Sequence, residues 1–184
     1  VAELCREVDA VAIFAPNMAR VQLMQEIVDA VKNGAELKGI ICEKPLGRTV
    51  AEANQIVELA KEAGLPTAYF ENQCHMKGIR AQKEQLRRVE ETMGPLVLAR
   101  SAEEHSGPHE PWFWDPTRQG GGVLSDMGCH SIACGWYVLT PNGKPVDFLE
   151  PISVQATTSL LKWGLPKYRK ELFERTRVDY SKTP

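Results

Sequence analysis

The fold is decided by the stretch Val8-Asp-Ala-Val-Ala-Ile-Phe-Ala15 and by the later run Gly39-Ile-Ile-Cys-Glu43. Both are short and rich in apolar and β-branched residues, which predicts buried strands. Between them lies an amphipathic segment over about Ala19–Asn33 that stops at Gly34, and it predicts a helix. This alternation is typical of β-α-β units around a parallel sheet.

A second unit of the same kind follows directly. Thr49 and Glu52 have the spacing of a capping box, so a helix should begin after Thr49 and run through Ala51–Ala63 to the stop signal Gly64. Thr67–Phe70 then supplies a third strand. Strand, helix, strand, helix, strand is one half of a doubly wound sheet with right-handed crossovers.

The rest of the chain has a different pattern. Gly94-Pro95 breaks a long charged helix, and a loop rich in glycine, proline and aromatic residues leads into a further helix. The expected elements are a helix over Met76–Thr92, a strand over Leu96–Ala102, a loop over Ser106–Gly122, a helix over Val123–Leu139 and a strand over Pro151–Leu161.

The predicted fold class is therefore α/β plus α+β. Residues 1–74 should form the C-terminal half of a Rossmann-like parallel sheet, and residues 75–184 part of an α+β domain with an antiparallel sheet. The chain opens on a short helix and an interior-looking strand, so we expect the first strands of the sheet to be missing. The antiparallel sheet should likewise be incomplete.

Composition excludes several classes of function. Twenty-two basic residues against 24 acidic ones give a net charge of −2, which gives no reason to expect nucleic acid or an anionic membrane as partner. No run of about 18 apolar residues occurs, and the first residues do not resemble a secretory signal. The five cysteines have no C-x-x-C spacing, so we expect a reducing cytoplasm, no disulfide framework and no bound metal.

Candidate functional residues occur in two places. Lys44, in Glu43-Lys44-Pro45, comes at the carboxyl end of a predicted parallel strand, where open α/β sheets bind their ligands. Asp126 and His130 follow the glycines 120–122 and are four residues apart, so on a helix they should face the same way. The alternatives are a solvated surface lysine, an aspartate that caps the helix and a core histidine.

Together these motifs resemble the Gfo/Idh/MocA family of oxidoreductases, named for glucose-fructose oxidoreductase and inositol dehydrogenase. Ala15-Pro16-Asn17 is similar to the family's turn after its fourth strand, and Glu71-Asn72 to its polar pair after the sixth. Trp112 lies in a stretch that resembles its tryptophan-containing loop. The resemblance extends to about Thr158 and then fades.

The resemblance implies a catalytic set of Lys44, Asp126 and His130. His130 would be the base that removes the hydroxyl proton, Lys44 would stabilise alkoxide character, and Asp126 would orient the imidazole or bind a neighbouring hydroxyl. It also implies NAD or NADP as cofactor, a sugar, cyclitol or polyol-like substrate, and a homo-oligomer, either a dimer or a tetramer. The implied cofactor contacts are Ala15, Pro16, Asn17, Glu43, Lys44, Asn72 and Trp112.

The sequence departs from the family pattern at several positions. Arg20 stands where the family usually has histidine, Phe113 where it has arginine, and Ala133 where it has aspartate. No G-x-G-x-x-G follows a first strand, so we expect roughly 60 further residues at the amino end, on the scale of about 30 residues per β-α-β unit. The aromatic group 112–114 either stacks on a ligand or closes the loop onto the core.

Two other functions remain open at this point. One is a glycosidase of the same superfamily that uses bound NAD for transient oxidation and elimination. The other is a non-catalytic binding subunit or fragment. Net accumulation of NADH, release of sugar, and cofactor affinity would separate the three.

Overall fold

The computed structural model describes residues 1–105, 107, 110–177 and 179, so residues 106, 108 and 109 of the expected loop lie outside the described part. The chain divides into two compact units. The first consists of Val1–Asn72 with Thr117–Cys129, and the second of Gln73–Pro116 with His130–Pro184. A segment that is distant in sequence, 117–129, therefore belongs to the first unit.

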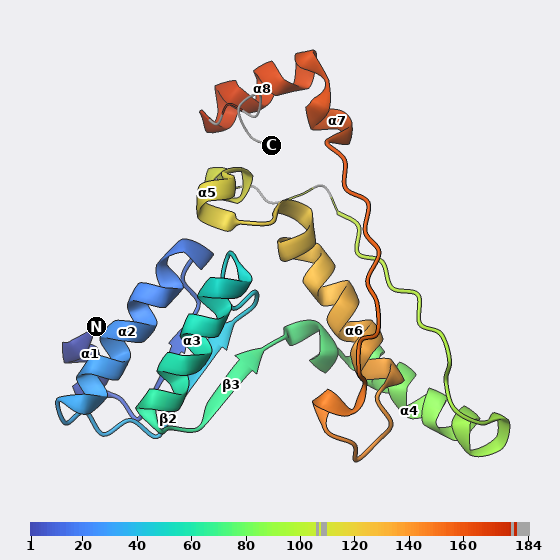
Figure 1. The fold of residues 1–184 in the computed structure, drawn as a ribbon, viewed down its shortest axis with the longest axis horizontal. Coiled ribbons are helices and arrows are strands. Elements are labelled where there is room, and N and C mark those ends of the chain that lie inside the picture. The colour runs from blue at the N-terminus through green and yellow to red at the C-terminus, as the bar shows by residue number, and fades with distance from the viewer. Residues whose placement is uncertain (106, 108–109, 178, 180–184) are drawn as a thin grey trace. The chain divides into compact units, whose positions relative to one another are not determined.

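The first unit contains a parallel three-stranded sheet (Figure 1). Its strands are β1 (Ala10–Ile13), β2 (Gly39–Glu43) and β3 (Thr67–Phe70), in the order β1-β2-β3. Both neighbouring pairs are parallel, with Ala12 opposite Ile41 and Ile41 opposite Ala68. The prediction of a Rossmann-like parallel sheet is confirmed.

Helices α2 (Arg20–Lys32) and α3 (Val50–Ala63) cover one face of this sheet (Figure 1). The short α1 (Ala2–Glu7) and η1 (Asn17–Ala19) precede α2. The buried side chains of α2 include Met24, Ile27 and Val28, which recur three and four residues apart and so form one apolar face. They pack with Ile13 and Ile40 in the core of the unit.

The ends of α3 follow from local chemistry. Thr49 Oγ1 accepts a hydrogen bond from the Glu52 amide at 3.2 Å, and the helix ends at Gly64, whose φ is 65°. The capping box differs in one respect, because the Glu52 carboxylate accepts from the Arg48 amide at 2.8 Å. The predicted helix is confirmed to within a residue.

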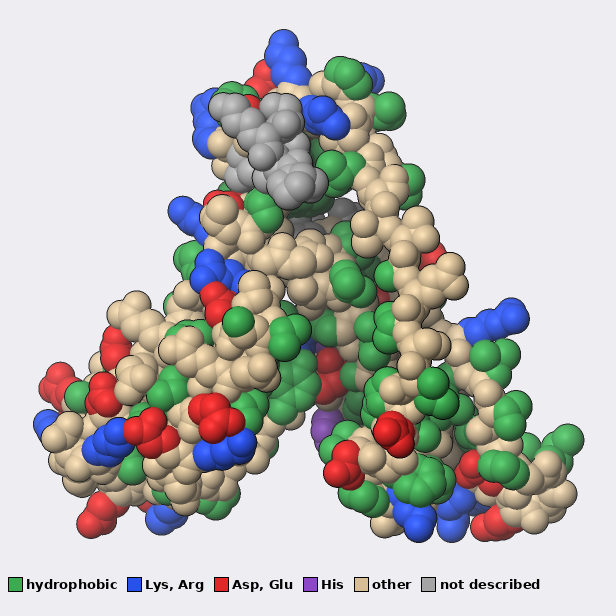
Figure 2. Space-filling model, viewed as in Figure 1, with side chains coloured by type: hydrophobic (Ala, Val, Ile, Leu, Met, Phe, Trp, Pro, Cys, Tyr) green, Lys and Arg blue, Asp and Glu red, His purple; other side chains and the backbone are tan. Residues whose placement is uncertain are grey.

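The outward face of these helices is charged. Figure 2 shows Lys, Arg, Asp and Glu side chains interspersed over α2 and α3. Two exposed ion pairs lie there, Lys32 with Glu62 and Lys61 with Glu58. Exposed pairs of this kind contribute little to stability. Because the side chains of both pairs are exposed, this face is a solvated surface.

The second unit is mainly helical. Within it, the ammonium group of Lys83 donates to the main-chain oxygens of Tyr137 and Thr140, and the Trp114 ring lies edge-on to Trp163 at 5.1 Å. None of the helices in the described residues is both long and apolar enough to cross a membrane. The helical elements of the chain from Asn72 onward are η2 (Asn72–His75), α4 (Lys77–Met93), η3 (Pro111–Trp114), α5 (Pro116–Gln119), η4 (Leu124–Gly128), α6 (Cys129–Leu139), η5 (Val146–Phe148), α7 (Leu161–Gly164) and α8 (Pro166–Thr176).

The strands predicted at Leu96–Ala102 and Pro151–Leu161 are not found. Among the described residues neither segment pairs with another strand, and Leu161 begins α7. Val97 and Val154 are 90% and 88% exposed. A segment of alternating apolar residues forms a strand only when a neighbouring strand supplies its hydrogen-bond partners. The sequence pattern alone is therefore insufficient to predict a strand. An antiparallel sheet stays a prediction.

Candidate functional site

Lys44 and Asp126 come together in the first unit although 82 residues separate them. Lys44 follows the last residue of β2, and its ammonium group donates to the main-chain oxygen of Asp126 at 2.6 Å and to its Oδ1 at 3.3 Å. The two side chains are only 15% and 18% exposed. The alternative of a freely solvated surface lysine is therefore wrong.

A half-buried ion pair at this place has chemical consequences. Partial burial reduces screening by salt, so the charges act more strongly on nearby groups than surface charges do. The ammonium group can also donate to a ligand oxygen, while a carboxylate can only accept. The pair can therefore bind a hydroxyl-bearing ligand and stabilise negative charge on one of its oxygens.

Arg20 holds the main chain on both sides of Lys44. Its Nη1 donates to Glu43 O at 2.7 Å and also to Pro45 O, while its Nε donates to Ala15 O at 2.9 Å. Burial lowers the pKa of this guanidinium, and the neighbouring Cys42 and Glu43 oppose that shift. Burial likewise raises the pKa of the Cys42 thiol.

Asn17, an expected cofactor contact, bonds to the last residue of α5, after which a loop leads to Asp126. The residue is 3% exposed, and its side-chain amide donates to the main-chain oxygen of Gln119 at 2.7 Å. Gln119 is 1% exposed and exchanges two hydrogen bonds with Gly122 through its side chain. Sequence reasoning missed Gln119, because a glutamine in a loop rich in glycine and proline carries no distinguishing pattern.

Gly120 allows the same loop to approach the chain after β2. Its φ is 94°, and a Cβ atom there would lie 2.7 Å from the main-chain oxygen of Arg48. The guanidinium of Arg48 in turn donates to the main-chain oxygen of Thr117 and pairs with Glu52. Glycine is thus required here both by its φ and by the close contact.

The helix that carries Asp126 is not a simple α-helix. The chain is π-helical over η4, which includes Asp126, and becomes α-helical at Cys129. Such π-helical turns are rare and occur often at functional sites. His130 is the second residue of α6 and is 6% exposed. The prediction that Asp126 and His130 face the same way assumed α-helical spacing throughout and stays a prediction.

The remaining expected cofactor contacts lie in two places. Ala15 and Pro16 follow β1, Glu43 ends β2, and the exposed Asn72 comes soon after β3. They therefore share the carboxyl edge of the sheet, where doubly wound folds bind nucleotides. Trp112 belongs to η3 in the second unit, where its ring stacks on Phe113 with centroids 3.8 Å apart.

This edge fits part of a dinucleotide. The Lys44 ammonium group, the strand-end turns and Asn72 offer hydrogen-bonding groups that a nucleotide can use. A glycine loop for the pyrophosphate does not occur in the sequence. The residues at this edge are therefore candidates for contacts with the cofactor, without those that bind its pyrophosphate.

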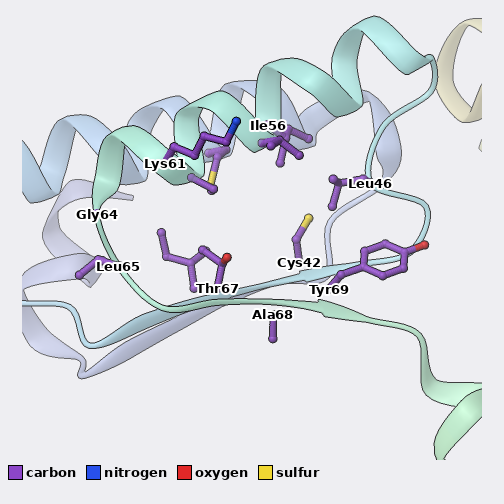
Figure 3. Close-up of a pocket in the computed structure, with 13 residues that line it drawn as sticks. Cys42, Leu46, Ile56, Lys61, Gly64, Leu65, Thr67, Ala68 and Tyr69 are labelled. Carbon is purple, nitrogen blue, oxygen red and sulfur yellow. The ribbon is translucent and has the colours of Figure 1, made fainter. Parts of the chain in front are cut away.

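A cavity in the first unit is separate from these residues. It has a volume of about 410 Å³ and lies between α3 and the sheet, where Cys42 points from β2 toward the helix (Figure 3). Its walls are mainly apolar, and the ammonium group of Lys61 pairs with Glu58. Neither Lys44 nor Asp126 lines it, so this cavity is not part of the candidate site. It is lined by Met24, Ile40, Cys42, Leu46, Ile56, Val57, Ala60, Lys61, Gly64, Leu65, Thr67, Ala68 and Tyr69.

Curated proteins with similar sequences include two from different organisms. An uncharacterized protein of Saccharomyces cerevisiae, YMR315W, is 32% identical over 121 residues, which cover 61% of this chain and 32% of that protein. The 1,5-anhydro-D-fructose reductase of Ensifer adhaerens is 26% identical over 161 residues, 86% of this chain and 44% of the reductase. The chain thus spans less than half the length of either relative.

Solved structures with a similar fold include GenD2 from gentamicin A biosynthesis in complex with NAD, at 26% identity and a TM-score of 0.62. That match covers 72% of this chain and 36% of GenD2. A probable dehydrogenase from Thermotoga maritima has a TM-score of 0.61 at 22% identity, over 75% of this chain and 39% of its own. The second likeness concerns the fold alone.

Two family models match successive parts of the sequence. Residues 1–70 match the model described as an oxidoreductase family with an NAD-binding Rossmann fold, and residues 84–171 match the Gfo/Idh/MocA C-terminal domain. Their order agrees with the parallel sheet and with the chain that follows it. This chain accordingly belongs to the Gfo/Idh/MocA family of oxidoreductases.

Proposed function

We propose that the full-length protein is an NAD(P)-dependent oxidoreductase that moves a hydride between a nicotinamide and a hydroxyl-bearing carbon of a sugar, cyclitol or related small molecule. The observation that carries this proposal is the half-buried pair of Lys44 and Asp126 at the end of β2. Family membership supports the class of reaction.

Cofactor contacts would come from the carboxyl edge of the sheet. Ala15, Pro16, Asn17, Glu43 and Asn72 would line the nicotinamide and ribose side, with Trp112 contributing from the second unit. The bound cofactor supplies the hydride chemistry itself. The names of relatives support NAD as the cofactor, since GenD2 binds it.

The chain's own residues would handle the proton and the charge. Oxidation of an alcohol requires removal of the hydroxyl proton, and the imidazole of His130 would accept it. The ammonium group of Lys44 would donate to the same oxygen and stabilise its developing negative charge. Asp126 would hold that ammonium group in place and accept a hydrogen bond from a neighbouring hydroxyl.

The substrate class follows from the polar groups and from one relative. An ammonium group beside a carboxylate suits a compound with two adjacent hydroxyls. One hydroxyl can accept a hydrogen bond from the ammonium group, and the other can donate one to the carboxylate. The reductase of Ensifer adhaerens carries a sugar-derived substrate in its name, which supports the same class.

The test is turnover of the full-length protein with NAD or NADP and a panel of sugars and cyclitols. Lys44→Met and His130→Asn should each reduce kcat by about 10²–10⁴-fold while the protein stays folded. Lys38→Met is the matched control, since Lys38 is 75% exposed and pairs with Asp9 on the surface. A deuterated substrate shows whether hydride transfer limits the rate.

Three outcomes would contradict the proposal. Near-normal turnover of Lys44→Met under hydride-limited conditions removes the lysine from the catalytic set. Release of sugar without net NADH indicates the glycosidase reaction instead. Failure of the full-length protein to bind either dinucleotide indicates a non-catalytic subunit.

We further infer a homo-oligomer, either a dimer or a tetramer, located in the cytoplasm. Buried Cys5 and Cys42 are free thiols, which supports a reducing compartment. The exposed apolar residues Val97, Ile152 and Val154 support burial against another subunit. Light scattering of the full-length protein gives the number of subunits, and a monomer would refute the oligomer.

A further inference from the structure

Arg20 is a charged residue that lies almost wholly inside the first unit. It is the first residue of α2 and has an exposed fraction of 3%. Burial of a charged side chain costs free energy unless its donors are hydrogen-bonded. A guanidinium in this position therefore requires specific partners.

The partners are three main-chain oxygens at the carboxyl ends of two neighbouring strands. Nε donates to Ala15 O, just after β1, and Nη1 donates to Glu43 O at the end of β2 and to Pro45 O beyond it. A planar guanidinium has several donors in a fixed fork, whereas a lysine ammonium is a compact point charge on a flexible stem. One side chain thus connects β1, β2 and the turn that follows β2.

Two of these oxygens belong to the residues immediately before and after Lys44. We propose that Arg20 is the positioning residue for Lys44, an inference that rests on the function proposed above. It fixes the main chain on both sides of the lysine, so that the ammonium group reaches Asp126. Arg20 touches no reacting group in this proposal, and it acts on the reaction through the position of Lys44.

The hydrogen bond between adjacent residues of the turn does not have this effect. The Lys44 amide donates to the carboxylate of Glu43 at 3.0 Å, but Glu43 is the adjacent residue and moves with the turn. The family usually has histidine at the position that corresponds to Arg20. An imidazole has at most two N–H donors. The three contacts with carbonyl groups made by Arg20 therefore need more donors than an imidazole offers.

The test compares Arg20→Lys with Arg6→Lys in the full-length protein. Arg6 lies exposed in α1 of the same unit, so its variant makes the same chemical change away from the turn. Arg20→Lys should lower kcat by about 10–100-fold, since displacement of a reacting group by about 1 Å has effects of this order. The Kd for the dinucleotide should change less than about threefold, because positioning acts on the reacting groups rather than on uniform binding.

Hydrogen exchange provides a readout that needs no turnover. In Arg20→Lys the peptide over residues 39–48 should exchange several-fold faster, while the peptide over α3, residues 50–63, keeps its wild-type rate. Arg6→Lys should leave both peptides and kcat unchanged. Arg20→Gln serves as a second variant with the same expected results if the lysine variant does not fold.

The outcomes separate this inference from the proposed function. Unchanged exchange over 39–48, or an equal increase in both peptides, overturns the positioning role. Wild-type kcat in Arg20→Lys, alongside an inactive Lys44→Met, also overturns it. Full activity of Lys44→Met refutes the proposed role of the lysine, while the exchange data still decide whether Arg20 holds the turn.

Discussion

Replacing Gly120 by alanine tests whether the glycine loop must approach the chain after β2. The φ of Gly120 is 94°, a region that residues with a side chain rarely adopt. The added Cβ would lie 2.7 Å from Arg48 O and 2.9 Å from Arg48 Cα. Both atoms belong to the main chain, so a side-chain rotation cannot relieve the contact.

The magnitude has two parts. The strained φ costs about 1–3 kcal/mol, and an overpacked contact of this kind costs a further 1–3 kcal/mol or so. Gly34 separates the two, because its φ is 90° and a Cβ there would have nothing within 4 Å. Gly34→Ala should therefore show only the first part, and Gly120→Ala roughly twice that loss.

Chemical denaturation of the two variants measures the difference in the free energy of unfolding. Steady-state kinetics show whether the change at Gly120 also affects the candidate site. Gly120→Ala should also lower kcat, because movement of the loop displaces Asp126 from Lys44. Gly34→Ala should leave kcat unchanged. If Gly120→Ala were no more destabilising than Gly34→Ala, or kept the wild-type kcat, the close approach would have no role in the site.

Two further predictions concern the start of α3. Thr49→Ala should destabilise the protein by about 1 kcal/mol in denaturant unfolding, since it removes the hydrogen bond to the Glu52 amide; Thr49→Ser, which keeps the hydroxyl, should lose little. The pKa of the Glu52 carboxyl lies below its ordinary value of 4.5, because Arg48 donates to it. The stabilising effect of the ionised Glu52 carboxylate is therefore complete above pH 4.5, and it is lost as the pH falls through the lowered pKa. Glu52→Gln should accordingly be less stable than wild type at pH 6–7, and the gap should narrow below about pH 4.5; a gap independent of pH would contradict this.

The parts of the fold that sequence predicted are those with local causes. β2 and β3 have the predicted bounds, since short apolar runs between glycine, proline and charged residues define them. The limits of α3 follow from Thr49 and Gly64, whose effects operate within one turn of helix. These signals depend little on the rest of the chain.

The parts that sequence did not predict depend on distant partners. Leu96–Ala102 alternates like a strand, but no neighbouring strand in the described residues pairs with it. The packing of 117–129 in the first unit depends on contacts of Asn17 and Arg48 with main-chain oxygens of that segment. Any residue can supply a main-chain oxygen, so such contacts have no signature in the sequence.

In the candidate site, too, some features could be predicted from the sequence and others depend on distant partners. Lys44 could be singled out because it follows a parallel strand, but its pairing with Asp126 could not be derived from spacing across 82 residues. Arg20 appeared in the sequence only as a departure from a family pattern. In the structure it binds the oxygens on both sides of Lys44, so a substitution that looked like a loss of one contact supplies another. A departure at a buried position next to a functional residue is therefore best interpreted by asking which main-chain groups the new side chain can reach.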